Sequence, residues 1–123
     1  MYKRQIFPVA GGLENATAGE SATSHKSVTI GVDSDMWGQV TDPKIKAVIL
    51  NSVTKGVGTS VAAVIKDTAA GKFTNVQYVG TLANKGTGLA GFHNLASKIP
   101  AKLQQELRAL AAAISSGSVD VTK

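Results

Sequence analysis

The feature that most constrains the fold of this chain is an apolar, β-branched run that ends in two carboxylates. The run is Val28–Val32, and Asp33 and Asp35 follow it. A second apolar run, Ala47–Val53, leads to Lys55. Open α/β folds bind ligands at the carboxyl ends of their strands. We therefore expect the acid and the lysine to face one site, which is a binding crevice rather than a reactive centre.

A third apolar run, Ile6–Ala10, ends in the glycine pair Gly11-Gly12. Glycine lacks a Cβ atom, so a ligand can approach the backbone closely at such a turn. The pair has neither the spacing of a dinucleotide fingerprint nor that of a P-loop. It therefore predicts a close ligand approach and no nucleotide-phosphate site.

The length of 123 residues corresponds to one domain at most, because domains cluster at roughly 100 to 150 residues. Hydrophobic residues make up 43% of the chain, only six residues are aromatic, and glycine is abundant. This composition suits helices packed closely on a sheet, so we expect the α/β class. The chain has no cysteine, which excludes a disulfide, a thiolate nucleophile and a cysteine metal site.

The net charge of +5 does not by itself indicate nucleic-acid binding. The lysines are scattered singly, with no basic cluster beyond Lys3-Arg4 and no aromatic residues interleaved for base stacking. No apolar stretch reaches the roughly 18 residues of a membrane span. His25 and His93 are far apart, and neither has a carboxylate at ligand spacing. We expect both histidines at the surface or in turns.

Hydrophobic periodicity and turn residues predict strands and helices that alternate along the chain. Such an alternation favours a parallel sheet with right-handed crossovers. The predicted strands are 6–10, 28–32 and 76–82, with an extended segment at 44–53 and an edge strand at 119–121. The predicted helices are 15–23, 57–70 and 100–116, and 36–43 is predicted to be an irregular loop.

Asp33 and Asp35 lie two residues apart, on one face of an extended strand, so a magnesium site is one reading. No third carboxylate is near in sequence. In the reading that we prefer, Asp35 caps or solvates the turn while Asp33 accepts hydrogen bonds from ligand hydroxyls. A carboxylate suits a sugar diol because its two oxygens accept from two hydroxyls at once. Lys55 would supply the complementary donor.

Five segments together resemble the basic membrane protein (BMP) family of substrate-binding lipoproteins, which serve ABC transporters. Each segment alone is weak, but the five occur in the right order. They are Ile6–Gly12, Ile30–Asp35, Ile49–Lys55, Gly86–Ala90 and Asn94–Pro100.

The resemblance implies the two-lobed type I periplasmic-binding fold, with residues 6–123 as its C-terminal portion, mostly the second lobe. Residues 1–5 do not match, and we expect them to be a non-native start. The resemblance further implies that about 56–72 belong to a first lobe that this sequence does not contain. The family's ribose contacts fall on Gly11, Asp33 and Lys55.

The resemblance also implies a function, which is capture of a nucleoside, of the purine class, between two lobes for delivery to an ABC permease. We expect no catalytic residues, no cofactor, no metal and no nucleic-acid partner. By resemblance, the location is the extracytoplasmic side of the cell membrane, through a lipid anchor. The alternatives are a ligand-sensing domain of a transcription regulator and a small metal-dependent α/β enzyme that uses Asp33 and Asp35.

Overall fold

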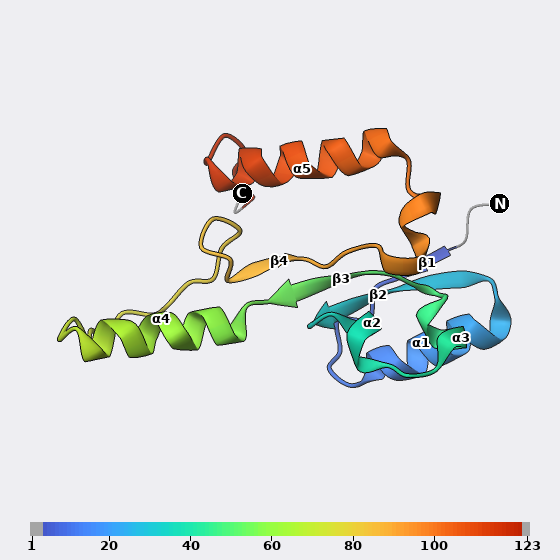
Figure 1. Ribbon diagram of the computed structural model, residues 1–123, viewed down its shortest axis with the longest axis horizontal. Coiled ribbons are helices and arrows are strands. Elements are labelled where there is room, and N and C mark those ends of the chain that lie inside the picture. The colour runs from blue at the N-terminus through green and yellow to red at the C-terminus, as the bar shows by residue number, and fades with distance from the viewer. Residues whose placement is uncertain (1–3, 122–123) are drawn as a thin grey trace. The chain divides into compact units, whose positions relative to one another are not determined.

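The computed structural model describes residues 4–121, which form an α/β fold with a four-stranded sheet (Figure 1). The predicted fold class is confirmed. In chain order, the elements are β1 (Arg4–Ile6), α1 (Leu13–Ser24), β2 (Ser27–Asp33), α2 (Met36–Gln39), α3 (Pro43–Lys46), β3 (Ile49–Lys55), α4 (Val57–Ala69), β4 (Thr87–Leu89), the 3-10 helix η1 (His93–Lys98) and α5 (Ala101–Ser115). The strand order is β1-β2-β3-β4, and β2 pairs in parallel with both β1 and β3.

The chain divides into two compact units. The first comprises the chain up to Thr54 together with Leu89–Ala101, and the second comprises Lys55–Gly88 and the chain from Lys102 on. None of the helices in residues 4–121 is both long enough and apolar enough to cross a membrane.

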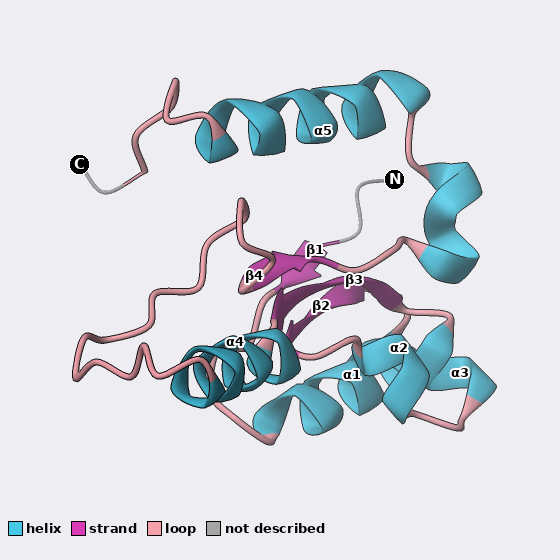
Figure 2. Ribbon diagram, turned by 60° about the vertical axis from the view of Figure 1, so that its left-hand side comes forward, coloured by secondary structure: helices cyan, strands magenta, loops and turns pink. Residues whose placement is uncertain are grey.

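In the first unit, α1, α2 and α3 lie on one side of β2 and β3 in both ribbon views (Figures 1 and 2). Ala18, Met36 and Ile49 form the buried centre of this layer, and partly buried apolar side chains of α2 and α3 pack against them. The core therefore lies between the sheet and these three helices.

Helix α1 is held to β2 by buried hydroxyls as well as by apolar contacts. The Ser21 hydroxyl lies 2.8 Å from that of Ser27 and 3.0 Å from that of Thr29, and all three residues are buried. The predicted helix at 15–23 is therefore confirmed and is longer than expected. Its Gly19 makes it a weak helix former, and packing on the sheet compensates for that.

A close contact between β2 and β3 fixes the position of α2. A Cβ atom added to Gly31 would lie 2.6 Å from Ser52 Oγ and 2.7 Å from Met36 Cβ. The same Ser52 hydroxyl accepts a hydrogen bond of 3.1 Å from the backbone N–H of Met36. Only glycine leaves room for this arrangement, so Gly31 sets how near the first turn of α2 comes to the sheet.

In the second unit, helix α4 begins at Val57 and ends at Ala69, as the apolar spacing predicted. None of its residues is buried, and the side chains of its apolar stripe are exposed. The final predicted helix is also confirmed, as α5. No described residue of this unit is buried, and apolar side chains of both helices, such as Val61 of α4 and Leu103 of α5, are exposed.

Several predicted extended segments are wrong. Strand 6–10 is displaced, because β1 is Arg4–Ile6 and pairs with Ser27–Thr29, while the chain after it turns at Pro8. Residues 76–82 form no strand. Instead, the Asn84 side chain accepts a hydrogen bond from the N–H of Thr81 and donates one to the Val79 carbonyl. These two backbone groups are therefore not available to pair with a neighbouring strand. Residues 119–121 form no strand either.

For residues 36–53 the sequence predicts a loop and one extended segment, which is only partly correct. Residues 36–39 form α2, and 43–46 form α3 before β3 begins at Ile49. The Asp42 carboxylate caps α3 by accepting from the N–H of Lys44 at 2.8 Å, and Pro43 occupies the first turn. Asp42 and Pro43 are typical residues for the start of a helix. The apolar residues that follow them led to the prediction of an extended segment instead.

Candidate functional site

The structure places two of the three predicted site residues in turns of the first unit. Gly11 lies in the loop between β1 and α1 with φ +60°, and open space surrounds the position where a Cβ atom would stand. Asp33 is the last residue of β2, is exposed and has φ +70°. Both positions therefore follow parallel strands, at the edge where α/β folds bind ligands.

Lys55, the third predicted residue, is the last residue of β3 and is exposed. The register pairs Asp33 of β2 with Thr54 of β3, the residue immediately before Lys55. Lys55 itself is the first residue of the second unit. Its participation in a common site with Asp33 stays a prediction.

Glu14 joins the Gly11 loop to the end of β2, a role that the sequence did not predict. Strand β1 ends at Ile6, which pairs with Thr29, so β1 stops three residues short of Val32. There the Glu14 carboxylate accepts a hydrogen bond of 2.8 Å from the backbone N–H of Val32. A side chain from the first turn of α1 thus satisfies a strand-end N–H group that β1 does not reach.

A second cluster lies on the turn that follows β2. The Nε2 atom of His93 contacts both carboxylate oxygens of Asp35, at 2.9 and 3.1 Å. The His93 ring also stacks on the Trp37 ring, with 4.5 Å between the centroids and 9° between the planes. Because a carboxylate accepts hydrogen bonds, His93 donates to Asp35 through Nε2.

This cluster corrects two expectations from the sequence. His93 is not a simple surface or turn residue, because it is partly buried and its partner carboxylate lies 58 positions away in the chain. Asp35 stands at the N-cap position of α2, yet its side chain makes no capping hydrogen bond there. Its carboxylate bonds to His93 instead. The other histidine, His25, is exposed at the end of α1, as expected.

A cation completes the surroundings of Trp37. The ammonium group of Lys46, in α3, lies 4.0 Å from the centre of the Trp37 ring, which is cation–π distance. The indole Nε1 atom is buried and has no hydrogen-bond partner among the described residues. Trp37 thus connects α2, α3 and the segment that carries His93.

Within residues 4–121, no three histidine or carboxylate side chains lie close enough together to hold a metal ion. The two acids of the Asp33-Ser34-Asp35 turn differ in setting, since Asp33 is exposed and Asp35 is partly buried against His93. The two carboxylates therefore have different surroundings and do not form one site.

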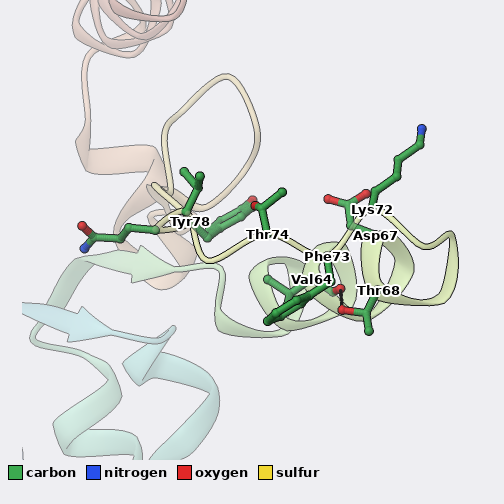
Figure 3. A pocket seen from close by; sticks show the side chains of 9 residues that line it. Val64, Asp67, Thr68, Lys72, Phe73, Thr74 and Tyr78 are labelled. Carbon is green, nitrogen blue, oxygen red and sulfur yellow. Dashed lines mark hydrogen bonds between the residues drawn. The ribbon is translucent and has the colours of Figure 1, made fainter.

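The second unit contains a shallow hollow of about 240 Å³ beside the end of α4 (Figure 3). Its lining mixes apolar and polar side chains of α4 and of the segment after it. The lining residues are Val64, Asp67, Thr68, Lys72, Phe73, Thr74, Val76, Gln77 and Tyr78. None of the predicted site residues belongs to this lining.

The fold is shared with solved structures of larger proteins. An ABC transporter solute-binding protein from Conexibacter woesei is 21% identical with a TM-score of 0.69, and the match covers 96% of this chain and 37% of that one. One from Aeropyrum pernix is 23% identical with a TM-score of 0.67, and the match covers 95% of this chain and 40% of that one.

A transcriptional activator of the comK gene from Bacillus halodurans also shares the fold. It is 14% identical with a TM-score of 0.80, over 96% of this chain and 38% of that one. The chain thus spans about two fifths of the length of these structures. No protein-family model and no curated protein matches the sequence.

Proposed function

We propose that this chain is part of a two-lobed binding protein that captures a nucleoside, of the purine class, and delivers it to an ABC permease. The fold of residues 4–121 supports the proposal, since it is shared with two solute-binding proteins over almost the whole chain. The five sequence segments that resemble the BMP family support the finer assignment.

The observation that carries the proposal is the position of Asp33. It ends a strand that has parallel neighbours on both sides, it is exposed, and its left-handed backbone turns the chain at the ligand-binding edge. A carboxylate there can accept hydrogen bonds from both hydroxyls of a ribose ring. Binding of an uncharged, hydroxyl-rich solute is the chemistry that this position favours.

Two further residues complete the proposed site. Gly11 would let the ligand approach the backbone of the β1–α1 loop, because no side chain fills the space beside it. Lys55 would donate from the end of β3, at a point where the chain passes from the first unit to the second. We propose binding without a chemical reaction and without a cofactor.

The proposal includes a longer protein. We propose that the polypeptide corresponding to the rest of the solute-binding proteins supplies a first lobe, to which residues 56–72 of this chain belong. A lipid anchor on that longer protein would hold it at the extracytoplasmic face of the membrane.

A second candidate function is a ligand-sensing domain of a transcription regulator. The likeness to the Bacillus halodurans activator, with its TM-score of 0.80, favours this candidate specifically. Both candidates bind a small molecule, and they differ in the partner of the longer protein. Copurification with a membrane permease supports the first candidate, and sequence-specific DNA binding by the longer protein supports the second.

The test of the site is calorimetric titration of adenosine, guanosine and inosine into the two-lobed protein. Asp33→Ala should weaken binding by about 2 to 4 kcal/mol, because hydroxyls buried on closure lose a charged acceptor. Lys55→Ala should weaken it somewhat less. Asp67→Ala removes an exposed carboxylate in α4 and serves as the matched control. Unchanged affinity in the Asp33 variant would remove this residue from the site.

A further inference from the structure

The turn that carries Asp33 is held from a distant part of the chain. His93 donates to the Asp35 carboxylate at 2.9 Å and stacks on Trp37, and these two residues follow Asp33 by two and four positions. One side chain, that of His93, therefore contacts two residues in or next to the β2–α2 turn. Neither contact is part of the site proposed above.

Asp33 adopts an uncommon backbone conformation that neighbouring groups can stabilise. Its φ of +70° lies in the left-handed region, which most residues with a side chain avoid and which Asp enters more readily than most. On its N-terminal side, Glu14 binds the N–H of Val32. On its C-terminal side, Ser52 accepts from the N–H of Met36, and His93 holds Asp35 and Trp37.

His93 is itself presented from a fixed segment. The N–H of Ala90 donates to the Ser52 carbonyl at 2.9 Å, and the Asn51 side chain donates to the Ala90 carbonyl. Three residues later, His93 begins η1 with φ +41°, again in the left-handed region. The segment at Ala90 is thus anchored to β3, and its backbone is shaped to present the His93 ring to the β2–α2 turn.

We propose that His93 is a positioning residue for ligand binding, which acts by holding the β2–α2 turn so that Asp33 keeps its left-handed backbone. The inference rests on the proposed function, because it assigns Asp33 as the ligand-binding carboxylate. It adds a residue that would not touch the ligand. A purely structural His93 would stabilise the whole first unit without a particular effect on this turn.

The first arm of the test needs no ligand. Amide hydrogen exchange is measured residue by residue in the 123-residue chain and in His93→Ala, His93→Gln and His25→Ala, at a concentration at which sedimentation velocity shows each chain to be monomeric. In His93→Ala, exchange at the hydrogen-bonded amides of Ser34 and Met36 should rise at least about tenfold, while exchange at Thr29, in the middle of β2, stays within about twofold. His93→Gln keeps an N–H donor and should restore part of the protection. His25→Ala, at the exposed end of α1, should change neither.

Fluorescence gives this arm a second readout. Trp37 is the single tryptophan of the chain, so its emission reports on the His93 contact directly. We expect the emission to change in His93→Ala and to stay unchanged in His25→Ala. Equal acceleration of exchange at Thr29 and at the turn would mean a general loss of stability and would overturn the inference. Unchanged exchange at the turn would also overturn it.

The second arm uses adenosine and the two-lobed protein. His93→Ala should raise the Kd for adenosine about tenfold, and in the Asp33→Ala background it should raise the Kd much less, because the two residues act on one interaction. If the unaltered protein binds no nucleoside, the proposed ligand is wrong, and the exchange arm still decides whether His93 holds the turn. If it binds adenosine and His93→Ala binds equally well, the inference is wrong.

Discussion

The carboxylate of Glu14 accepts a hydrogen bond of 2.8 Å from the backbone N–H of Val32, which links the first turn of α1 to the end of β2. Glu14 follows the Gly11 loop and Val32 precedes Asp33 in the chain. Strand β1 does not extend far enough to pair with Val32, so a side chain takes the place of a strand. This hydrogen bond joins the two turns in which we propose that Gly11 and Asp33 contact the ligand.

Replacing Glu14 should therefore destabilise the first unit. Glu14→Ala leaves the Val32 N–H without this acceptor and should lower the free energy of unfolding by about 1 to 3 kcal/mol. Glu14→Gln keeps an oxygen acceptor and should lose less. Urea denaturation of both variants checks this. An alanine variant as stable as the unaltered chain would show that the hydrogen bond contributes nothing to stability.

Gly31 should not tolerate even the smallest side chain. In Gly31→Ala, the added methyl group would meet Ser52 Oγ at 2.6 Å and Met36 Cβ at 2.7 Å, so the free energy of unfolding should fall by about 1 to 3 kcal/mol.

Gly19→Ala is the matched control, because no atom lies within 4 Å of the added Cβ and the site is inside helix α1. That substitution should raise stability by about 0.5 to 1 kcal/mol. Thermal melting of the two alanine variants measures both changes. A Gly31 variant that gains stability would contradict the close contact of β2, β3 and α2.

The exposed stripe of α4 should make the isolated chain self-associate. Val57, Val61 and Ile65 are 63, 52 and 62% exposed. Burying each such side chain contributes roughly 1.5 to 3 kcal/mol, so the isolated chain lacks a substantial part of a domain's net stability of about 5 to 15 kcal/mol. We expect it to be marginally stable, prone to aggregate and nearly unable to bind nucleosides.

Sedimentation velocity at several concentrations tests this. Ile65→Lys should reduce association, whereas Thr59→Lys, on the opposite side of α4, should reduce it less. A chain that stays monomeric at every concentration and binds nucleosides with micromolar affinity would contradict the account.

Ligand binding should not require a metal ion. Asp33 and Asp35 lie in separate surroundings, and a hard cation such as Mg²⁺ needs about six oxygen ligands. Treatment of the two-lobed protein with EDTA should therefore leave nucleoside affinity unchanged. Loss of binding with EDTA and its return with magnesium or calcium would favour a metal-dependent enzyme.

The sequence predicted the elements whose pattern is local. Helices α4 and α5 follow from apolar residues at helical spacing, and β2 follows from a β-branched run that is buried in the structure. The predicted strand at 76–82 is wrong because an apolar run becomes a strand only beside a partner. There the Asn84 side chain bonds to the backbone of Thr81 and Val79 instead.

The sequence predicted Gly11 and Asp33 from their positions after strands, but it could not predict the residues that support them. Glu14 and Val32 are 18 positions apart, and Asp35 and His93 are 58 apart. Such pairs depend on how far β1 extends and on where the segment after β4 is anchored. No local spacing reports either property. Helix α3 is different, since Asp42 and Pro43 are helix-start signals that the sequence does contain.

The central claim is that Asp33 binds the ribose hydroxyls of a nucleoside, and a thermodynamic cycle tests it most directly. Calorimetry measures the affinity of the two-lobed protein and of Asp33→Ala for adenosine and for 2′-deoxyadenosine. The account predicts that the unaltered protein prefers adenosine by about 1 to 3 kcal/mol and that Asp33→Ala loses most of this preference. An equal preference for adenosine in both proteins would contradict it.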